Sequence, residues 1–440
     1  MDLIKRTLSL SVIFVLALLC CNMNNVFAAT YYVSPDGTNT WPNCTSSENP
    51  CPASGTNKEF LGARAGDTVY FLPGTYDPGN APSWEVPAWN PTNSGSSGNL
   101  ITFKAYNNAT CLILKNDIGP SIGSNGRDWI VWDGFSGKKG DVTNTFVRFA
   151  NNTHCTIQNC DFTGSSVTVS INVPVFVHTV SYFTMRNCKL HGSLGPDTTN
   201  STGFMSYYMT NSTIEHNEFY NNRVGYRDKV CATNNTIRYN FFHSGGGYWL
   251  DAAGTGGSSH HIYIYQNVIL NSKIYIGLDA FSGSYVYIYN NTIYNGGDAI
   301  VTEGQAVDII EVFNNIIHTA TRGIHLYSTT TNRYFDYNNV YTYTYWGSLG
   351  ANDYSLANWR TALGGCPGTG RECNGVTTNP NFVNAGGNFV TDYKRTSYPA
   401  TGRGGSYPNV TGAYITGNEI IGCGAGSIVP KSPTGLRIIP

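Results

Sequence analysis

An apolar–polar motif recurs through the middle of the chain and marks an internal repeat. Each copy has an apolar residue, one or two variable residues, an asparagine, and then apolar residues again. The asparagines that we assign to it are Asn159, Asn187, Asn217, Asn240, Asn267, Asn291, Asn315 and Asn339. From Asn217 onward, subtraction of these positions gives steps of 23, 27, 24, 24 and 24 residues. Such steps are too short for a globular domain and predict one coil of a solenoid each.

Alternation inside each copy predicts strands. In Ile262-Tyr263-Ile264-Tyr265 the isoleucines can face inward and the tyrosines outward, and no helical period of 3.6 runs through the repeat. An asparagine at the bend after such a strand both donates and accepts, so stacked copies can hydrogen-bond from coil to coil. The pattern therefore predicts an all-β solenoid with an asparagine ladder.

Segments outside the repeat strengthen this interpretation. They are Tyr31–Gly37, Ala65–Tyr70, Pro73–Tyr76, Gly98–Phe103, Tyr354–Leu356 with Trp359, Asn379–Val383 and Gly412–Tyr414. Together with the ladder, they resemble the right-handed parallel β-helix proteins of the pectate-lyase-like superfamily, and the last three resemble closing coils. The resemblance implies a single-stranded right-handed parallel β-helix. It leaves the chemistry open, because lyases, hydrolases, epimerases and non-catalytic adhesins share this scaffold.

The chain divides into five predicted parts. In residues 1–29, Lys5 and Arg6 precede an apolar run and small residues follow it, an order that is typical of a secretory signal peptide. We expect an N-terminal cap and first coils over 30–149, regular coils over 150–345, C-terminal coils with a disulfide loop over 346–425, and a tail over 426–440. The protein is therefore expected to be secreted or at the cell surface, without a membrane span, and to be a monomer.

Cysteine spacing and charge narrow the expected partners. Cys44 with Cys51 and Cys366 with Cys373 are close enough in sequence to close small disulfide loops in an exported protein. Charged residues make up 12% of the chain and the formal net charge is −1, which argues against nucleic acid as a partner. The abundance of tyrosine, glycine and asparagine suits an extracellular protein that contacts a polysaccharide.

Four charged residues stand at equivalent places in successive coils. Lys229, Asp251, Asp279 and Glu303 each follow a ladder asparagine by 11 or 12 residues. Equivalent positions in a parallel solenoid are ~4.8 Å apart, so we expect one column of a cation and three carboxylates. The residues two positions earlier should share its face, and the next coil adds two more. These are Arg227, Trp249, Gly277 and Val301, with His325 and Tyr327.

The column suggests a polysaccharide lyase. Adjacent carboxylates repel unless a cation joins them, so Asp251, Asp279 and Glu303 are predicted Ca²⁺ ligands. Lys229 would then remove the proton beside a uronic acid carboxylate while Arg227 neutralises the substrate. Trp249, with His325 and Tyr327, would bind the sugar. In alginate and dermatan lyases of the superfamily the arginine follows about one coil after the lysine, a pattern that this chain does not reproduce.

Other interpretations stay open. Asp251 and Asp279 at ~5 Å would suit a retaining glycoside hydrolase, which leaves Lys229 without a role. Lys229 could also pair with Asp251 on a solvated face, a kind of contact worth roughly 0–1 kcal/mol. A third possibility is a non-catalytic adhesion protein that binds glycans through its aromatic side chains.

Overall fold

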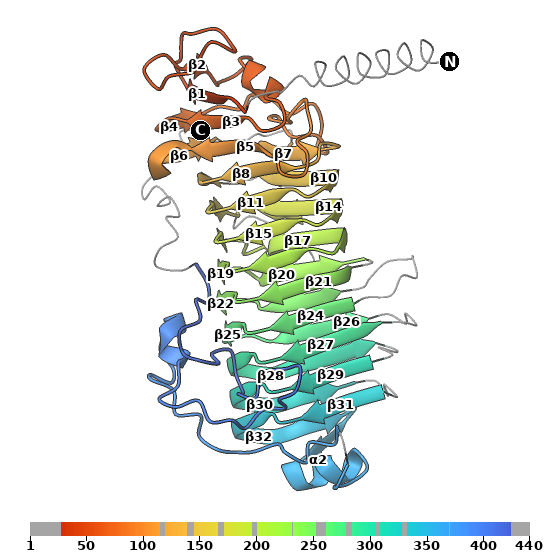
Figure 1. The fold of residues 1–440 in the computed structure, drawn as a ribbon. Helices are drawn as coiled ribbons and strands as arrows, with labels where there is room; N and C mark the ends of the chain where they lie inside the picture. The colour runs from red at the N-terminus through yellow and green to blue at the C-terminus, as the bar shows by residue number, and fades with distance from the viewer. Residues whose placement is uncertain are drawn as a thin grey trace, which may run out of the picture.

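The structure, a computed structural model, is an elongated stack of coils (Figure 1). It describes residues 28–114, 119–138, 145–165, 171–195, 200–230, 232–251, 261–278, 284–304, 309–327, 332–368 and 370–423. Nearly all of the predicted signal peptide and tail lies outside these ranges, so those two parts remain predictions. The predicted right-handed parallel β-helix is confirmed, because strands of successive coils pair in parallel along the whole stack.

Three parallel sheets form the walls of the solenoid. Sheet 1 contains β7 (Ile122–Asn125), β10 (Val147–Thr153), β14 (Val175–Ser181), β17 (Asn200–Thr210), β20 (Val224–Lys229), β23 (Tyr248–Asp251), β26 (Ile274–Leu278) and the later parts of β28 (Thr292–Gly304), β30 (Ile316–Leu326) and β32 (Asn339–Leu349).

Sheet 2 contains β1 (Thr30–Ser34), β3 (Thr68–Phe71), β5 (Ile101–Ala105), β8 (Ile130–Asp133), β11 (Thr156–Gln158), β15 (Thr184–Arg186), β18 (Thr213–Glu215), β21 (Thr233–Arg238), β24 (His261–Tyr265), β27 (Tyr285–Tyr289), β29 (Ile309–Phe313) and β31 (Asn332–Asp336). Its inward isoleucines, such as Ile262 and Ile264, are fully buried, as the alternation predicts.

Sheet 3 contains β4 (Gly74–Tyr76), β6 (Cys111–Ile113), β9 (Phe135–Lys138), β12 (Asp161–Thr163), β16 (Lys189–His191), β19 (Glu218–Tyr220), β22 (Phe241–His243), β25 (Val268–Leu270) and the first parts of β28, β30 and β32. Shorter elements are β2 (Cys51–Pro52), β13 (Ile171–Asn172), β33 (Asn352–Tyr354), α2 (Leu356–Ala362) and the 3-10 turns Glu59–Gly62, Tyr106–Asn108 and Val390–Tyr393.

The ends of the solenoid are covered by aromatic side chains. Phe60, in the first 3-10 turn, packs edge-on against Trp89 at 5.1 Å and both are buried. At the other end, α2 begins at Ser355, whose hydroxyl accepts a hydrogen bond from the Asn358 backbone N–H, and its Trp359 is fully buried. These caps keep the apolar interior of the terminal coils out of water, as solenoids require.

The asparagine ladder is present and fully buried. The Oδ1 of Asn240 accepts both the backbone N–H and the Nδ2 of Asn217, at 3.0 and 3.1 Å. The Nδ2 of Asn240 in turn donates to the backbone carbonyl of Ile214 in the preceding coil at 2.8 Å. The same pattern joins every later coil through Asn267, Asn291, Asn315 and Asn338.

The phase of the ladder differs from the prediction at both ends. The last member is Asn338, not Asn339, so the final step is 23 residues. In the early coils the ladder position belongs to Cys188, whose N–H donates to Asn217 at 2.9 Å. The predicted Asn187 precedes it and occupies a left-handed turn, with φ of 53°, and Asn159 does the same before Cys160, with φ of 55°. Asparagine tolerates this backbone conformation, which explains why it recurs one residue early.

A carboxyl group closes the ladder. Glu372 accepts the backbone N–H of Asn338 on Oε1 at 3.0 Å and the Nδ2 of the same residue on Oε2 at 3.0 Å. It lies in the loop closed by the Cys366–Cys373 disulfide, which confirms the predicted pairing, as does the Cys44–Cys51 disulfide. Glu372 is fully buried, and burial raises its pKa to about 8.

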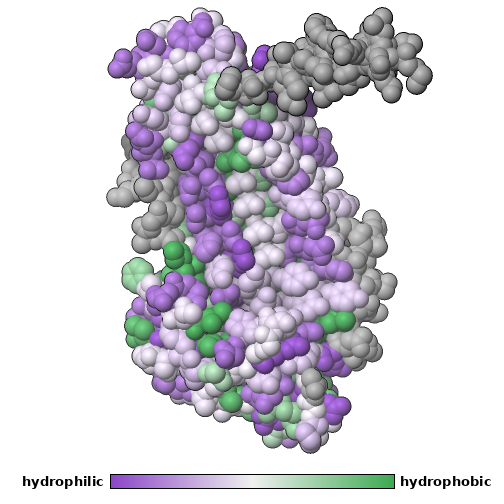
Figure 2. Space-filling model, viewed as in Figure 1, coloured by the Kyte–Doolittle hydropathy of each residue, from purple (hydrophilic) through white to green (hydrophobic). Residues whose placement is uncertain are grey.

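The chain beyond the last coil does not form the predicted closing coils. Residues 379–423, here called the C-terminal strap, run back along the outside of sheet 3 (Figure 1). The Gly412 N–H donates to the Asn314 carbonyl and the Gly422 N–H to the Tyr239 carbonyl, each at 2.7 Å. Figure 2 shows apolar residues gathered where the strap crosses the coils.

A second apolar cluster explains why the strap binds there. The outward side of sheet 3 carries apolar residues that would otherwise face water. The cluster consists of Phe241, Val268 and Leu270 of the sheet with Tyr393, Ala413, Tyr414 and Ile421 of the strap. Burial of this surface stabilises the bound strap by about 25 cal/mol for each Å² of apolar area removed from water.

We predict that loss of one ladder asparagine destabilises the fold strongly. Asn267→Ala leaves the backbone N–H of Asn240 without its acceptor, together with the Asn240 amide. Each unsatisfied buried group costs ~1–3 kcal/mol, so the free energy of unfolding in urea should fall by about 3 kcal/mol. The exposed Asn49→Ala is the control and should change it by less than ~0.5 kcal/mol. Equal effects of the two variants would refute the ladder's structural role.

We also predict that stability falls as the pH rises from about 4 to about 8. Burial raises the pKa of Asp228 to about 7 and that of Glu372 to about 8, from ordinary values of 3.8 and 4.5. Both pKa values are higher in the folded state, so their contribution is complete below about pH 4, declines as the pH rises, and is lost once the pH has passed 7 to 8. In thermal unfolding the Tm should decline from about pH 4 to about pH 8. The plot of Tm against pH should be flatter for the double variant Asp228→Asn/Glu372→Gln. An unchanged slope in the double variant would assign the pH dependence to other groups.

Candidate functional site

The strand register places most of the predicted charged column on the outward face of sheet 1. Lys229 pairs with Asp251, Asp251 pairs with Gly277, and Gly277 pairs with Glu303. In the other direction Lys229 pairs with Tyr207 of β17. Lys229, Asp251 and Glu303 therefore share one column, as predicted.

The column position that we had assigned to Asp279 belongs to another residue. Gly277 occupies it, and Asp279 lies outside the described residues. The alignment failed because the stretch between the ladder asparagine and the column varies: Lys229 follows Asn217 by 12 residues, whereas Gly277 follows Asn267 by only 10. Asp251 and Glu303 consequently stand two coil steps apart, roughly 10 Å at the spacing of paired strands.

A second row runs beside the column, two residues earlier on each strand. It contains Arg227, Trp249, Tyr275, Val301 and His325 in register. Tyr275 thus takes the place that we had expected for Gly277. Val301 is almost fully buried, so this row reaches a ligand mainly through its charged and aromatic members.

Two cations meet at one end of the face. The Lys229 Nζ lies 3.4 Å and the Arg227 Nη1 3.3 Å from the Oδ1 of Asn200. The same Nζ lies 5.7 Å from the ring centroid of Tyr207. Asn200 and Tyr207 both come from β17, one coil before Lys229, and sequence reasoning missed them. Counting back one coil from Lys229 would have reached Tyr207, but Asn200 is brought in by the long β17 strand.

Aromatic rings form the middle of the face. Trp249 lies 5.2 Å from Tyr275 between ring centroids, with the rings tilted by 43°. The Arg223 guanidinium and the Lys273 ammonium lie 5.8 and 5.9 Å from the Trp249 ring. Cations near a half-buried indole are held by its π-electrons. The Tyr275 hydroxyl donates to Glu303 Oε2 at 2.5 Å, which engages that carboxylate.

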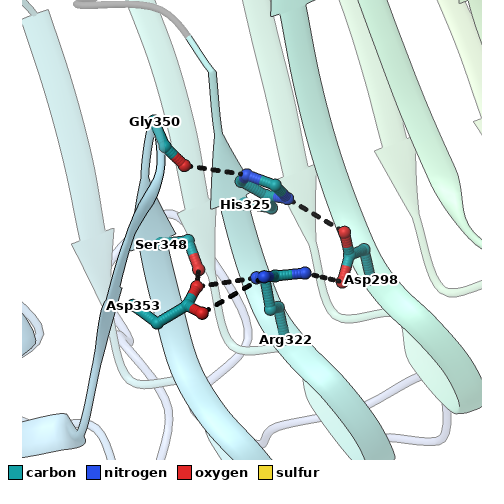
Figure 3. Close-up of polar contacts among 6 residues, drawn as sticks. All are labelled: Asp298, Arg322, His325, Ser348, Gly350 and Asp353. Carbon is teal, nitrogen blue, oxygen red and sulfur yellow. Dashed lines mark hydrogen bonds and ion pairs between the residues drawn. The ribbon is translucent and has the colours of Figure 1, made fainter.

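His325 belongs to a polar cluster rather than to the accessible face (Figure 3). Its Nδ1 lies 2.9 Å from Asp298 Oδ2 and its Nε2 lies 3.2 Å from the Gly350 carbonyl. Its side chain is 4% exposed, so neither ring nitrogen is left for a sugar. The predicted substrate contact by His325 is therefore replaced by a structural role. Tyr327, stacked on the imidazole at 3.9 Å and 51% exposed, remains a candidate.

Arg322 connects this cluster to the end of the solenoid. Its guanidinium donates to both oxygens of Asp353 at 2.7 and 3.1 Å and to Asp298 at 3.3 Å (Figure 3). The bond from Arg322 lowers the pKa of the Asp353 carboxyl, and the Ser348 hydroxyl donates to the same group. Since Asp353 lies on β33, which pairs antiparallel with β32, this network fixes the last hairpin to the coils.

Two of the three predicted Ca²⁺ ligands, Asp251 and Glu303, stand two coil steps apart in the column. Gly277 separates Asp251 from Glu303, and Tyr275 binds Glu303. Among the residues that the structure describes, no three histidine, cysteine or acidic side chains are grouped as for a metal ion. The side chains of Asp251 and Asp279 lie outside that description, so calcium binding remains a prediction and no chemical step depends on it here.

Comparisons with known proteins agree with the fold. Residues 147–340 match the family model described as a right handed beta helix region. The solved structure of pectate lyase Pel9A is 17% identical, with a TM-score of 0.51, over 89% of this chain and 97% of that chain. No curated protein matches the sequence.

Two further solved structures are similar at lower scores. A rhamnogalacturonan lyase is 16% identical with a TM-score of 0.42, over 70% of this chain and 84% of that one. A mannuronic acid specific polysaccharide family 6 lyase from human gut microbiota is 12% identical with a TM-score of 0.42, over 73% and 81%.

The structural comparison concerns the fold alone. In the part of the chain that the structure describes, no helix has the length and apolar character needed to span a bilayer. The three parallel sheets, the buried ladder and the matched coils agree with one another. The chain therefore has the right-handed parallel β-helix fold, which it shares with pectate lyase Pel9A.

Proposed function

We propose that this protein is a secreted polysaccharide lyase that cleaves a uronic-acid-containing polymer by β-elimination on the outward face of sheet 1. The observation that carries the proposal is the pair of cations on β20. Lys229 and Arg227 project from one strand, share the Asn200 amide oxygen and lie beside Tyr207. A lyase needs a cation for the substrate carboxylate and a base for the neighbouring proton, and this pair supplies both.

The proposed reaction uses residues of the chain alone. Arg227 binds the uronate carboxylate and stabilises the negative charge that develops on it. Lys229, as the neutral amine, takes the proton from the carbon next to the carboxylate. The electron pair released forms a carbon–carbon double bond, the bond to the glycosidic oxygen breaks, and that oxygen takes a proton, which we assign to the Tyr207 hydroxyl.

The direction of the columns suggests how the polymer lies. Equivalent positions follow the solenoid axis, so a chain bound along this axis would meet Lys229, Trp249 and Tyr275 in successive coils and Tyr327 two coils later. Trp249 is half-buried and can pack against the C–H face of a sugar ring. Extended polymers need such repeated contacts, which a row of coils provides.

A glycoside hydrolase is the second candidate. The predicted retaining pair is not supported, because Asp251 aligns with Gly277 rather than with Asp279. Asp251 and Glu303, roughly 10 Å apart by strand spacing, approach the ~6.5–9.5 Å separation of inverting enzymes. This alternative leaves Lys229 and Arg227 without a role. A non-catalytic glycan-binding protein, the third candidate, would bind the polymer and release no product.

The first experiment measures β-elimination directly. Lys229→Ala should lower kcat for a uronate polymer by about 10²- to 10⁴-fold, the usual contribution of a positioned base. Product is followed by the ultraviolet absorbance of the new double bond. The control is Lys104→Ala, a lysine of sheet 2 paired with Asp133, which should keep wild-type activity. If Lys229→Ala kept full activity, Lys229 would not be the base. Release of reducing ends without the absorbance of the unsaturated product would favour hydrolysis.

A separate experiment addresses calcium. We propose that, if Asp251 and Asp279 hold a Ca²⁺ ion, a chelator lowers the rate of product formation and added Ca²⁺ restores it. Asp279→Asn should then lose the restoration, since a carboxylate ligand has been removed. If chelation left the rate of product formation unchanged, Arg227 alone would neutralise the substrate carboxylate.

A further inference from the structure

A concave site lies between the C-terminal strap and the outward side of sheet 3. Its cavity is about 650 Å³, within the ~300–1,000 Å³ typical of small-ligand sites. Sheet 3 contributes Glu218, Phe241 and His243 to the lining, and the strap contributes Phe389 and Lys394 among others. This strap pocket is built from strands other than those of the Lys229 column, so the proposed lyase site does not explain it.

Both carboxylates of the strap pocket have hydrogen-bond or ion-pair partners within the protein. Glu218 Oε1 lies 2.9 Å from His243 Nε2, and its Oε2 lies 3.5 Å from the Lys189 ammonium. Glu419 is bound within its own loop, where it accepts the backbone N–H groups of Thr416 and Gly417 at 2.8 and 2.9 Å. The oxygens of both acids are therefore engaged by donors of the protein.

Lys394 is the lysine of the pocket lining. Its ammonium lies 5.5 Å from the Tyr414 ring centroid, and the Tyr414 hydroxyl donates to the Val390 carbonyl at 3.1 Å, which holds the ring in place. Within the described ranges, no carboxylate lies at ion-pair distance from Lys394. A cation at the wall of a pocket without a carboxylate partner favours an anionic ligand.

The apolar part of the strap pocket is accessible as well. Phe389 is 73% exposed and Ile420 59% exposed, although both line the cavity. The tyrosines of sheet 2 differ, because they cover one another. Tyr263 and Tyr287 stack at 5.0 Å with an angle of 8° between their rings, so they present mainly edges to solvent. An exposed phenyl ring beside a cation is suited to a ligand with one apolar face and a negative charge.

We propose that the strap pocket is a second saccharide site, which binds a uronic acid residue of an oligosaccharide. Lys394 contacts the carboxylate, Phe389 packs against the C–H face of the sugar ring, and the His243–Glu218 pair contacts hydroxyl groups. The identity of the ligand rests on the proposed function, since it is a segment of the same polymer. Bound there, the polymer is retained near the cleavage face, which raises its effective concentration.

The test measures binding in a background that removes the cations of sheet 1. In Arg227→Ala/Lys229→Ala, calorimetry should detect tetragalacturonate or tetramannuronate binding. Adding Lys394→Gln should weaken that binding at least tenfold, and adding Phe389→Ser should weaken it to a similar extent. The matched control is Val383→Ser, a 62% exposed apolar residue of the same strap that is not part of the pocket lining, and it should leave the affinity unchanged.

The outcomes separate this proposal from the lyase proposal. Binding of neither tetrasaccharide, or unchanged affinity in Lys394→Gln and Phe389→Ser proteins with wild-type Tm, overturns the strap pocket as a uronate site. Equal binding of uncharged xylotetraose overturns the role of Lys394. Absence of unsaturated product from the wild-type protein overturns the lyase proposal only, because the binding measurement does not depend on cleavage.

Discussion

The hydrogen bond from one buried asparagine to the next is the interaction on which the rest of this molecule depends. Each ladder side chain accepts from the coil before it and donates to a backbone carbonyl there, so two neighbouring coils can stack in only one register. A slip of one residue would leave several buried amides unsatisfied. On the N-terminal side Cys188 takes the ladder position, and its thiol donates to the Arg186 carbonyl. On the C-terminal side Glu372 ends the ladder.

Because the register between coils is fixed, side chains at equivalent positions of the repeat are aligned on one face of the solenoid. Residues more than twenty positions apart in the sequence become neighbours on one face, as Lys229 and Asp251 do on sheet 1. The three sheets then differ in what their outward residues are. Sheet 1 presents cations and aromatic rings, sheet 2 presents stacked tyrosines, and sheet 3 presents apolar residues that the strap covers.

The strap shows how a solenoid gains a concave site. An outward sheet face is nearly flat, and a pocket needs a second wall. The strap supplies that wall because Phe241, Val268 and Leu270 retain it by apolar contact. The polar and accessible residues at its margin, Lys394 and Phe389, then line a cavity against Glu218 and His243. The same covering that stabilises sheet 3 thereby creates a place for a ligand.

The sequence by itself determined the coil, the alternation of inward and outward residues and both disulfides, because these follow from local periodicity and short spacing. It also placed Lys229 against Asp251. It could not align Asp279, since turn length changes by one or two residues between coils and moves every later side chain along its strand. Asparagine pairs such as Asn338-Asn339 likewise left the phase of the ladder ambiguous.

Only the tertiary structure decided which side chains face one another across coils and which surfaces are covered. In the folded chain both ring nitrogens of His325 have partners, and Asn200 and Tyr207 lie beside Lys229. Glu372 is buried at the end of the ladder, and the C-terminal strap packs on sheet 3. The physical reason is that each of these contacts joins segments more than twenty residues apart. Their partners are set by packing and by satisfaction of buried polar groups, and no local pattern in the sequence records either.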